Sequence, residues 1–164
     1  AATMGIEENL ALALRRGTLR TLKPGINNSE RKLYRDLLLR LGLGLEDRLT
    51  SKVGLLSGGQ RQALALIIAT MADIDLLILD EHTAALDPKS SETLMKITEK
   101  VLKEKHLTTL MVTHNLRFAV EYGSRLVMMH GGSAVMDIDG EAKKNLVVDD
   151  ILGKFNEISI ECGN

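Results

Sequence analysis

The stretch LLILDEHTAALDP, residues 76–88, decides the fold, because it joins an apolar run to two acidic residues and then to a helix start. A short apolar run that ends in carboxylates, as residues 76–80 do, is typical of a strand buried on both faces of a parallel sheet. Asp87 and Pro88 supply an N-cap followed by proline at the first helical position. We therefore predict a fully buried strand that leads into a helix.

The alternation of strand and helix continues toward the C-terminus. TTLMVTH, residues 108–114, predicts a second buried strand, and a helix is expected over 116–122. RLVMMHGGSAVMDIDG, residues 125–140, predicts two strands joined as a hairpin about Gly131-Gly132. An amphipathic segment follows near 148–155. Strands that alternate with helices imply a parallel sheet with right-handed crossovers, and therefore an α/β fold class.

Helical spacing of apolar residues dominates the part of the chain before residue 72. The expected helices cover residues 4–16 up to Gly17, a segment from Asn28 or Ser29 to Gly42, and a segment from Ser57 to Met71, with a short helical turn and a loop over 41–54. The chain therefore divides into a helical region (1–72), a region of strands and helices (73–146) and a C-terminal tail (147–164).

The composition limits the classes of partner and compartment. The 164 residues carry 21 basic and 22 acidic side chains, a balance that gives no general attraction to nucleic acid or to anionic lipid. The scarcity of aromatic residues disfavours base-stacking surfaces, and no apolar run is long enough to cross a bilayer. Cys162 is the single cysteine, so an internal disulfide is excluded and a reducing, cytoplasmic compartment is favoured.

Polar groups with possible chemistry stand at the ends of the two predicted strands. In a parallel sheet, ligands bind beyond the carboxyl ends of the strands. Asp80 and Glu81 could supply a ligand for a hard cation and a base that orients water, or they could cap the following loop. His114 follows the next strand and could equally be a solvated residue at a helix start, and capping alone explains Asp87.

Ser57, Gly58 and Gly59 combine a hydroxyl N-cap with bare backbone at a helix N-terminus. Unpaired amides and the helix dipole make such an end an anion site, and missing side chains let a phosphate come within hydrogen-bonding distance. The alternative explanation is a tight loop-to-helix turn that needs positive φ angles.

Four ordered motifs together resemble the nucleotide-binding subunit of ABC transporters: LSGGQ at 56–60, LLILDE at 76–81, AALD at 84–87 and THN at 113–115. MGIEENLALALRRG, residues 4–17, is similar to the start of that family's helical subdomain. The resemblance implies a partial P-loop NTPase-like fold, with a parallel sheet remnant, flanking helices and an N-terminal helical subdomain. It also implies ATP and Mg²⁺ as ligands of the complete subunit.

The resemblance assigns the signature motif to Ser57, Gly58, Gly59 and Gln60, and implies that this motif contacts the γ-phosphate of ATP held by the opposite subunit. Phosphoryl transfer needs positioning and charge neutralisation, which backbone amides can supply.

The remaining roles follow from the same resemblance. It implies that Asp80 lies near Mg²⁺, Glu81 orients the attacking water, Asp87 stands at the dimer interface, and His114 is the switch histidine near the γ-phosphate. His82 stands where the family commonly has proline, and we expect little effect on the chemistry because Glu81 is retained.

The phosphate-cradling pattern G-x-x-x-x-G-K-[ST] does not occur in the sequence; the nearest spacing, Gly54 to Gly59, is followed by Gln60 instead of lysine. Since an initiator methionine is also missing, we expect the chain to be the C-terminal portion of a longer ATPase subunit. Alone, it should neither bind ATP tightly nor hydrolyse it. A sheet edge and an apolar face should be exposed and should promote self-association.

The resemblance implies the energy-coupling subunit of a bacterial transporter. A second ATP-binding subunit and transmembrane permease subunits are the expected partners, at the inner face of the cell membrane, and no nucleic acid is expected. Details such as DEHTAALDP, residues 80–88, are most similar to importers of small solutes such as amino acids. The alternatives are a soluble ABC-type ATPase of DNA repair or chromosome organisation, and a noncatalytic, truncated dimerisation module.

Overall fold

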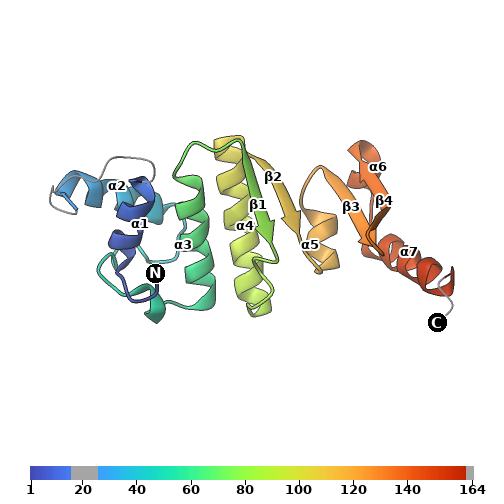
Figure 1. Cartoon of the computed structure of the whole chain (residues 1–164), viewed down its shortest axis with the longest axis horizontal. Coiled ribbons are helices and arrows are strands. Elements are labelled where there is room, and N and C mark those ends of the chain that lie inside the picture. Colours follow the sequence, from blue (N-terminus) through green and yellow to red (C-terminus); the bar gives the residue numbers. More distant parts are fainter. Residues whose placement is uncertain (16–25, 162–164) are drawn as a thin grey trace. The chain divides into compact units, whose positions relative to one another are not determined.

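The computed structural model describes residues 1–15 and 26–161. The chain forms two compact units, Ala1–Met111 and Val112–Asn164 (Figure 1). Gly17, the expected end of the first helix, and Cys162 lie outside the described residues.

Helices make up the first part of the first unit, in agreement with the apolar spacing of the sequence. They are α1 (Ile6–Leu14), α2 (Asn28–Leu39), the short 3-10 turn η1 (Val53–Leu55) and α3 (Gly58–Thr70). α2 begins where Asn27 and Glu30 form a reciprocal cap: the Asn27 side chain accepts a hydrogen bond from the Glu30 amide at 2.9 Å, and a Glu30 carboxylate oxygen accepts one from the Asn27 amide at 3.1 Å. The expected helices are therefore confirmed, although α1 is shorter than the predicted range 4–16.

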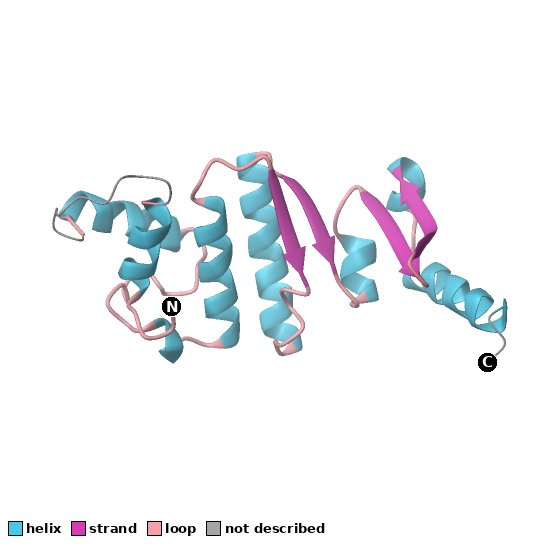
Figure 2. Ribbon diagram, viewed as in Figure 1, coloured by secondary structure: helices cyan, strands magenta, loops and turns pink. Residues whose placement is uncertain are grey.

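The sheet of the first unit contains β1 (Leu76–Asp80) and β2 (Thr108–Val112), joined by α4 (Pro88–Lys105). Their arrows point the same way in Figure 2, as expected for a strand–helix–strand connection. Asp87 caps α4 and Pro88 is its first residue, which confirms the prediction from the sequence. The helix ends at His106, whose backbone is left-handed (φ 52°).

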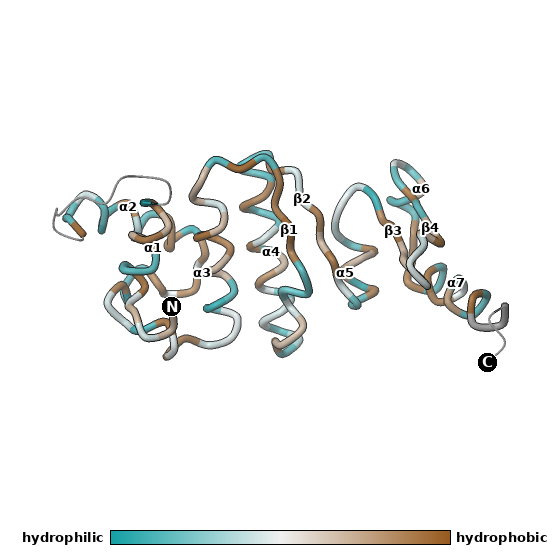
Figure 3. Tube along the Cα trace, in the orientation of Figure 1, coloured by the Kyte–Doolittle hydropathy of each residue, from teal (hydrophilic) through white to brown (hydrophobic). Residues whose placement is uncertain are grey.

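The core of the first unit is formed by α1, α2, α3, α4 and one face of the sheet. Leu77 points into a buried cluster that includes Leu64 of α3 and Leu94 of α4. Apolar residues continue along β1 up to Leu79, before the terminal Asp80 (Figure 3). Burial of these residues stabilises the unit by roughly 1.5–3 kcal/mol for each large side chain removed from water.

The prediction that both strands are buried on both faces is wrong for the structure. Leu76, Ile78 and Leu110 alternate with the inward residues and keep 51%, 60% and 54% of their surface exposed. The physical reason is that α4 packs on one face of the sheet, while no element in the described part of the first unit packs on these three side chains. An apolar run of this kind is typical of a strand covered on both faces, and the described residues of the first unit cover one face.

The second unit contains the predicted hairpin and three helices: α5 (Leu116–Glu121), β3 (Arg125–His130), β4 (Ser133–Asp139), α6 (Gly140–Lys144) and α7 (Val148–Glu161). β3 and β4 pair antiparallel, and the turn glycines Gly131 and Gly132 both have positive φ, 55° and 81°, as a tight hairpin turn requires. The sequence did not predict α6, and α7 extends beyond the expected segment 148–155. Leu126, Met128 and Ile151 belong to a separate buried cluster.

Among the described residues, no helix is both long and apolar enough to cross a membrane.

Candidate functional site

The turn before α3 is built by Ser57 and Gln60. The Ser57 hydroxyl oxygen accepts a hydrogen bond from the Gln60 amide at 3.2 Å, and Gln60 Oε1 accepts one from the Ser57 amide at 3.1 Å. This capping box explains why the helix begins at Gly58. The other end of the same side chain reaches a separate loop, because Gln60 Nε2 donates to the Leu43 carbonyl oxygen at 3.2 Å.

The two glycines after Ser57 are not explained by backbone conformation. Neither Gly58 nor Gly59 has a positive φ, so the interpretation as a left-handed turn is wrong. A Cβ atom on Gly58 would lie 2.8 Å from Leu86 Cδ2, which shows that the absent side chain leaves room for Leu86. At Gly59 the nearest atom would be Ser90 Cβ at 3.5 Å, an ordinary contact distance. The fold therefore has a use for glycine at 58 but does not require it at 59.

A shallow groove runs between the first turns of α3 and α4. Ser57, Gly59 and Gln60 line one side, and Lys89, Ser90 and Thr93 line the other. Both helices present their N-termini here, where unpaired amides carry partial positive charge. Serine hydroxyls and the Lys89 ammonium add further donors. Leu43, Leu94 and Ile97 complete the lining, so the groove offers an anion these donors beside an apolar surface.

Asp87 bounds this region as the N-cap of α4. Its Oδ1 accepts a hydrogen bond from the Ser90 amide at 3.1 Å. Hydrogen bonds from Ser90 hold the pKa of the Asp87 carboxyl below its ordinary value, so the side chain is a carboxylate at neutral pH. The first unit thus brings Asp87 close to the turn that contains Ser57 and Gly58, through Leu86 and Ser90.

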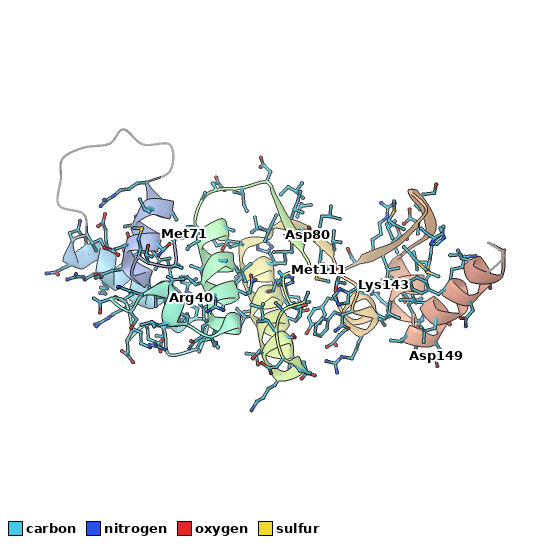
Figure 4. The ribbon with its side chains drawn as sticks, turned by 60° about the horizontal axis from the view of Figure 1, so that its bottom comes forward. Arg40, Met71, Asp80, Met111, Lys143 and Asp149 are labelled. Carbon is cyan, nitrogen blue, oxygen red and sulfur yellow. The ribbon has the colours of Figure 1, made fainter. Side chains whose placement is uncertain are left out.

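Asp80 and Glu81 lie at the carboxyl end of β1, as predicted, and both side chains are exposed (Figure 4 labels Asp80). The Glu81 backbone is left-handed, with φ 42°. For a residue with a side chain this conformation costs about 1 kcal/mol or more, and such residues cluster at functional sites. The Glu81 carbonyl oxygen accepts a hydrogen bond from the Ala84 amide at 2.9 Å, which holds the turn that follows the strand.

The chemistry of these carboxylates suits a hard cation. Mg²⁺ prefers oxygen ligands and is usually bound by one or two carboxylates, with water and phosphate oxygens completing its shell. Among the described residues no group of three or more His, Cys, Asp or Glu side chains could hold a metal ion. Asp80 is exposed and offers carboxylate oxygens to such a cation, whose other ligands would come from elsewhere.

His82 differs from the acids beside it because its side chain is partly buried. Burial lowers the pKa of His82, and no described residue hydrogen-bonds its Nε2 atom. Neutral imidazole is therefore the favoured form in the folded protein. The sequence identified His82 as unusual at this position but did not predict its burial.

His114 belongs to the second unit and is exposed. It lies just before α5, which begins with a cap: Asn115 Oδ1 accepts a hydrogen bond from the Phe118 amide at 3.2 Å, and the Asn115 amide donates to Thr113 Oγ1 at 3.0 Å. The geometry thus fixes the backbone on either side of His114. The other predicted site residues, 57–60, 80, 81 and 87, all lie in the first unit.

The sequence did not reveal the residues that shape the groove without belonging to a predicted site. Leu86 packs toward Gly58, Ser90 lies beside Gly59, and Leu43 accepts a hydrogen bond from Gln60. Leu86 and Ser90 are close to the cap residue Asp87 in the sequence, so their nearness to that motif could be seen there. Their contacts with Gly58 and Gly59 could not, because these contacts depend on how the start of α4 packs against the start of α3.

Comparison with known proteins gives concordant results. A family model described as "ABC transporter" matches residues 3–84. The tyrosine transport ATP-binding protein of Clostridioides difficile (strain R20291) is 48% identical over 153 residues, a match that covers 93% of this chain and 61% of the relative. The phosphonates import ATP-binding protein PhnC of Halobacterium salinarum is 34% identical over 139 residues, with coverage of 84% and 49%.

Solved structures show the same relationship at the level of the fold. An ATP-binding cassette of an ABC transporter in its ADP conformation superposes with a TM-score of 0.73 at 23% identity, covering 99% of this chain and 64% of that structure. A dimeric cassette in a post-hydrolysis state, bound to ADP and Pi, gives a TM-score of 0.66 at 26% identity and covers 85% and 58%. The chain spans about three fifths of the length of these proteins. Because the family model matches half of the chain, the chain belongs to the ABC transporter family.

Proposed function

We propose that the chain forms part of an ATP-hydrolysing subunit that drives a bacterial importer of small solutes. The observation that carries this proposal is that residue 59 is a glycine although the fold does not require one there. Glycine in a helix costs up to about 1 kcal/mol relative to alanine, and the fold has space for a Cβ atom at this position. Bare backbone beside a helix N-terminus supports close approach of a phosphate group that comes from outside the chain.

In this proposal the residues divide the work of phosphoryl transfer. Ser57, Gly58 and Gly59 donate hydrogen bonds to the terminal phosphate, and Asp80 holds Mg²⁺, which when bound would neutralise phosphate charge. Glu81 accepts the proton of the attacking water and orients it. These groups supply positioning and electrostatic stabilisation, which dominate the catalysis of phosphoryl transfer.

Three further positions complete the proposed site. Gln60 belongs to the same turn as the phosphate donors and contributes to nucleotide binding. Asp87 lies at the interface with a second ATP-binding subunit, and His114 acts as a switch near the terminal phosphate. The fixed backbone around Asn115 and the cap at Asp87 support these roles, because both hold their residues at element ends where a ligand can reach them.

The remaining parts of the site come from other polypeptide. We propose that this chain is a portion of a longer subunit and that a second subunit holds the nucleotide in its phosphate loop. The sequence contains no such loop of its own, and the chain covers 61% of the 48%-identical relative. The exposed apolar face of Leu76, Ile78 and Leu110 also supports the proposal that the chain is a portion of a longer subunit, because further polypeptide would cover this face.

The class of solute is proposed from the names of the relatives. The 48%-identical protein is named for tyrosine transport, and another relative is named for import of phosphonates. An amino acid is therefore the proposed cargo, transmembrane permease subunits are the proposed partners, and the helical region 1–72 is the proposed surface toward them. The strand region 73–146 would then hold the carboxylates, and 147–164 would be a tail. The site of action would be the cytoplasmic face of the membrane.

MgATP hydrolysis by the complete subunit tests this function. We expect turnover by the complete subunit, none above background with Glu81→Gln, and none by residues 1–164 alone. Because Gln keeps the size of Glu but cannot accept the proton, this variant separates catalysis from folding. Turnover that Glu81→Gln leaves unchanged would refute the proposed role of Glu81, and turnover by residues 1–164 alone would refute the need for further polypeptide.

A further inference from the structure

The Gln60 side chain spans two segments of the first unit that are distant in sequence. Its Oε1 accepts from the Ser57 amide at 3.1 Å, while its Nε2 donates to the Leu43 carbonyl at 3.2 Å. Gln60 also donates its backbone amide to the Ser57 hydroxyl at 3.2 Å. One residue therefore fixes the first turn of α3 and joins it to the loop that follows α2.

The loop that accepts this hydrogen bond turns between core residues: Leu41 and Leu45 are buried, and Leu43 packs against the same cluster. Leu43 stands between Gly42 and Gly44, which have left-handed φ angles of 65° and 68°. No atom lies within 4 Å of where a Cβ would stand on either glycine. The bond from Gln60 therefore adds a polar link between the α3 start and this loop, whose Leu43 also lines the groove.

The same hydrogen bonds decide which donors at the helix start are left for a ligand. The Ser57 amide is occupied by Gln60 Oε1, and the Arg61 amide donates to the Ser57 carbonyl at 2.9 Å. The described structure contains no acceptor bonded to the amides of Gly58 and Gly59. Because the Ser57 oxygen already accepts the Gln60 amide, its own proton is free to point elsewhere.

We infer that Gln60 is a positioning residue: by holding Ser57 and the Leu43 carbonyl, it fixes the turn whose two glycyl amides, unpaired as at any helix start, and one hydroxyl proton are directed at the phosphate. This inference rests on the proposed function, and it gives Gln60 a role that acts through other groups, beyond any contact of its own with the nucleotide. The link to Leu43 also makes the loop after α2 responsible for the geometry of the phosphate donors.

Substitution of Gln60 by Met in the complete subunit tests this role, since Met has a similar length and cannot form either side-chain hydrogen bond. We expect kcat to fall about tenfold, which corresponds to loss of roughly one hydrogen bond, and KM for MgATP to stay within about twofold. In the nucleotide-free protein, exchange of the Ser57 amide hydrogen should become faster. Gln62→Met is the matched control: Gln62 lies in the same helix, no described residue hydrogen-bonds its side chain, and both measurements should stay as in the wild type.

Two further variants separate positioning from direct contact. Gln60→Glu keeps an oxygen acceptor for the Ser57 amide and should preserve its slow exchange, which also shows that the variant folds. Combined with Ser57→Ala, Gln60→Met should lower kcat by less than the product of the two single effects, because groups that act as a unit are not additive.

Multiplicative effects, or a raised KM with unchanged exchange at Ser57, would overturn the inference in favour of direct contact. Absence of hydrolysis by the wild-type subunit would instead refute the proposed function, and the exchange measurement would then decide alone whether Gln60 holds the turn.

Discussion

Leu86 occupies the space that a side chain on Gly58 would need: a Cβ atom there would lie 2.8 Å from Leu86 Cδ2. The tip of a leucine side chain can move, so alanine at 58 would be accommodated by a small shift of Leu86. This contact couples the turn before α3 to the residue just before the cap of α4. The two glycines therefore differ: a side chain at 58 would displace Leu86, whereas the fold has space for one at 59, where a ligand is proposed to need the bare backbone.

Gly59→Ala is expected to leave folding intact and to impair ATP hydrolysis. Alanine has a higher helix propensity, so the free energy of unfolding should stay the same or rise by up to about 1 kcal/mol. The added methyl group would stand where the phosphate approaches, and kcat should fall at least about tenfold. Calorimetry and phosphate release by the complete subunit measure the two effects.

Gly153→Ala provides the control for this substitution. Gly153 lies within α7, and no atom lies within 4 Å of where its Cβ would stand. The variant should gain the same helix propensity and retain full hydrolysis. Full activity of Gly59→Ala would show that no ligand needs the bare backbone at 59.

Asp87 is expected to stabilise α4 through its charge as well as its hydrogen bond. Asn caps helices about as well as Asp, so Asp87→Asn keeps the cap and removes the charge, whereas Asp87→Ala removes both. The melting temperature at pH 7 should therefore decrease from wild type to Asn to Ala. Because the folded protein holds the pKa of Asp87 below 3.8, the advantage of wild type over Asn is present above pH 3.8 and is lost as the pH falls through the lowered value. An advantage that stayed constant down to pH 2 would contradict a charge effect.

His82 is expected to make stability depend on pH in a different range. Burial places the pKa of His82 below 6.5, so protonation favours the unfolded chain. Its contribution to stability is complete above pH 6.5 and is lost as the pH falls through the lowered folded value. His82→Gln cannot titrate and should lose less stability than wild type between pH 7 and pH 5, as measured by denaturant unfolding. Equal losses in the two proteins would mean that His82 titrates alike in both states.

The exposed face of β1 and β2 is expected to cause self-association of residues 1–164. Ile78→Ser, which removes the most exposed of its three apolar side chains, should reduce the sedimentation-average mass toward that of a monomer. Leu55→Ser is the control, because Leu55 is 72% exposed in η1 and does not belong to the sheet. A wild-type chain that sediments as a monomer at all concentrations would contradict the prediction.

Local signals in the sequence were sufficient for most of the elements. Caps at Ser57 and Asp87 marked helix starts, the start expected at Asn28 or Ser29 lies at Asn28 with Asn27 as its cap, and the glycine pair 131–132 marked the hairpin. The burial of β1 could not be predicted correctly, because an apolar run reports what a strand can pack against and not whether that layer is present. The short helix α6 could not be predicted because its five residues have little apolar periodicity. Its burial depends on the elements around it.

Motifs in the sequence name the candidate site residues, but the packing around them is not visible in the sequence. Residue type and position make Ser57, Glu81 and Asp87 candidates, and the resemblance to the family supplies their proposed roles. It could not show that Leu86 fills the space at Gly58, because that contact joins two helix starts through the packing of α3 against α4.

Mixing two inactive variants of the complete subunit tests most directly the claim that this chain supplies half of an intermolecular ATP site. One variant carries Gly59→Glu, which blocks the phosphate donors, and the other carries Glu81→Gln, which removes the base. Each should be inactive as a symmetric dimer. In a mixed dimer, one site combines the intact Glu81 of the first variant with the intact Ser57–Gly59 turn of the second, so mixing before addition of MgATP should restore about a quarter of wild-type hydrolysis. Failure to restore hydrolysis, with mixed dimers demonstrated by differently tagged subunits, would show that these residues act within one subunit and would contradict the proposal.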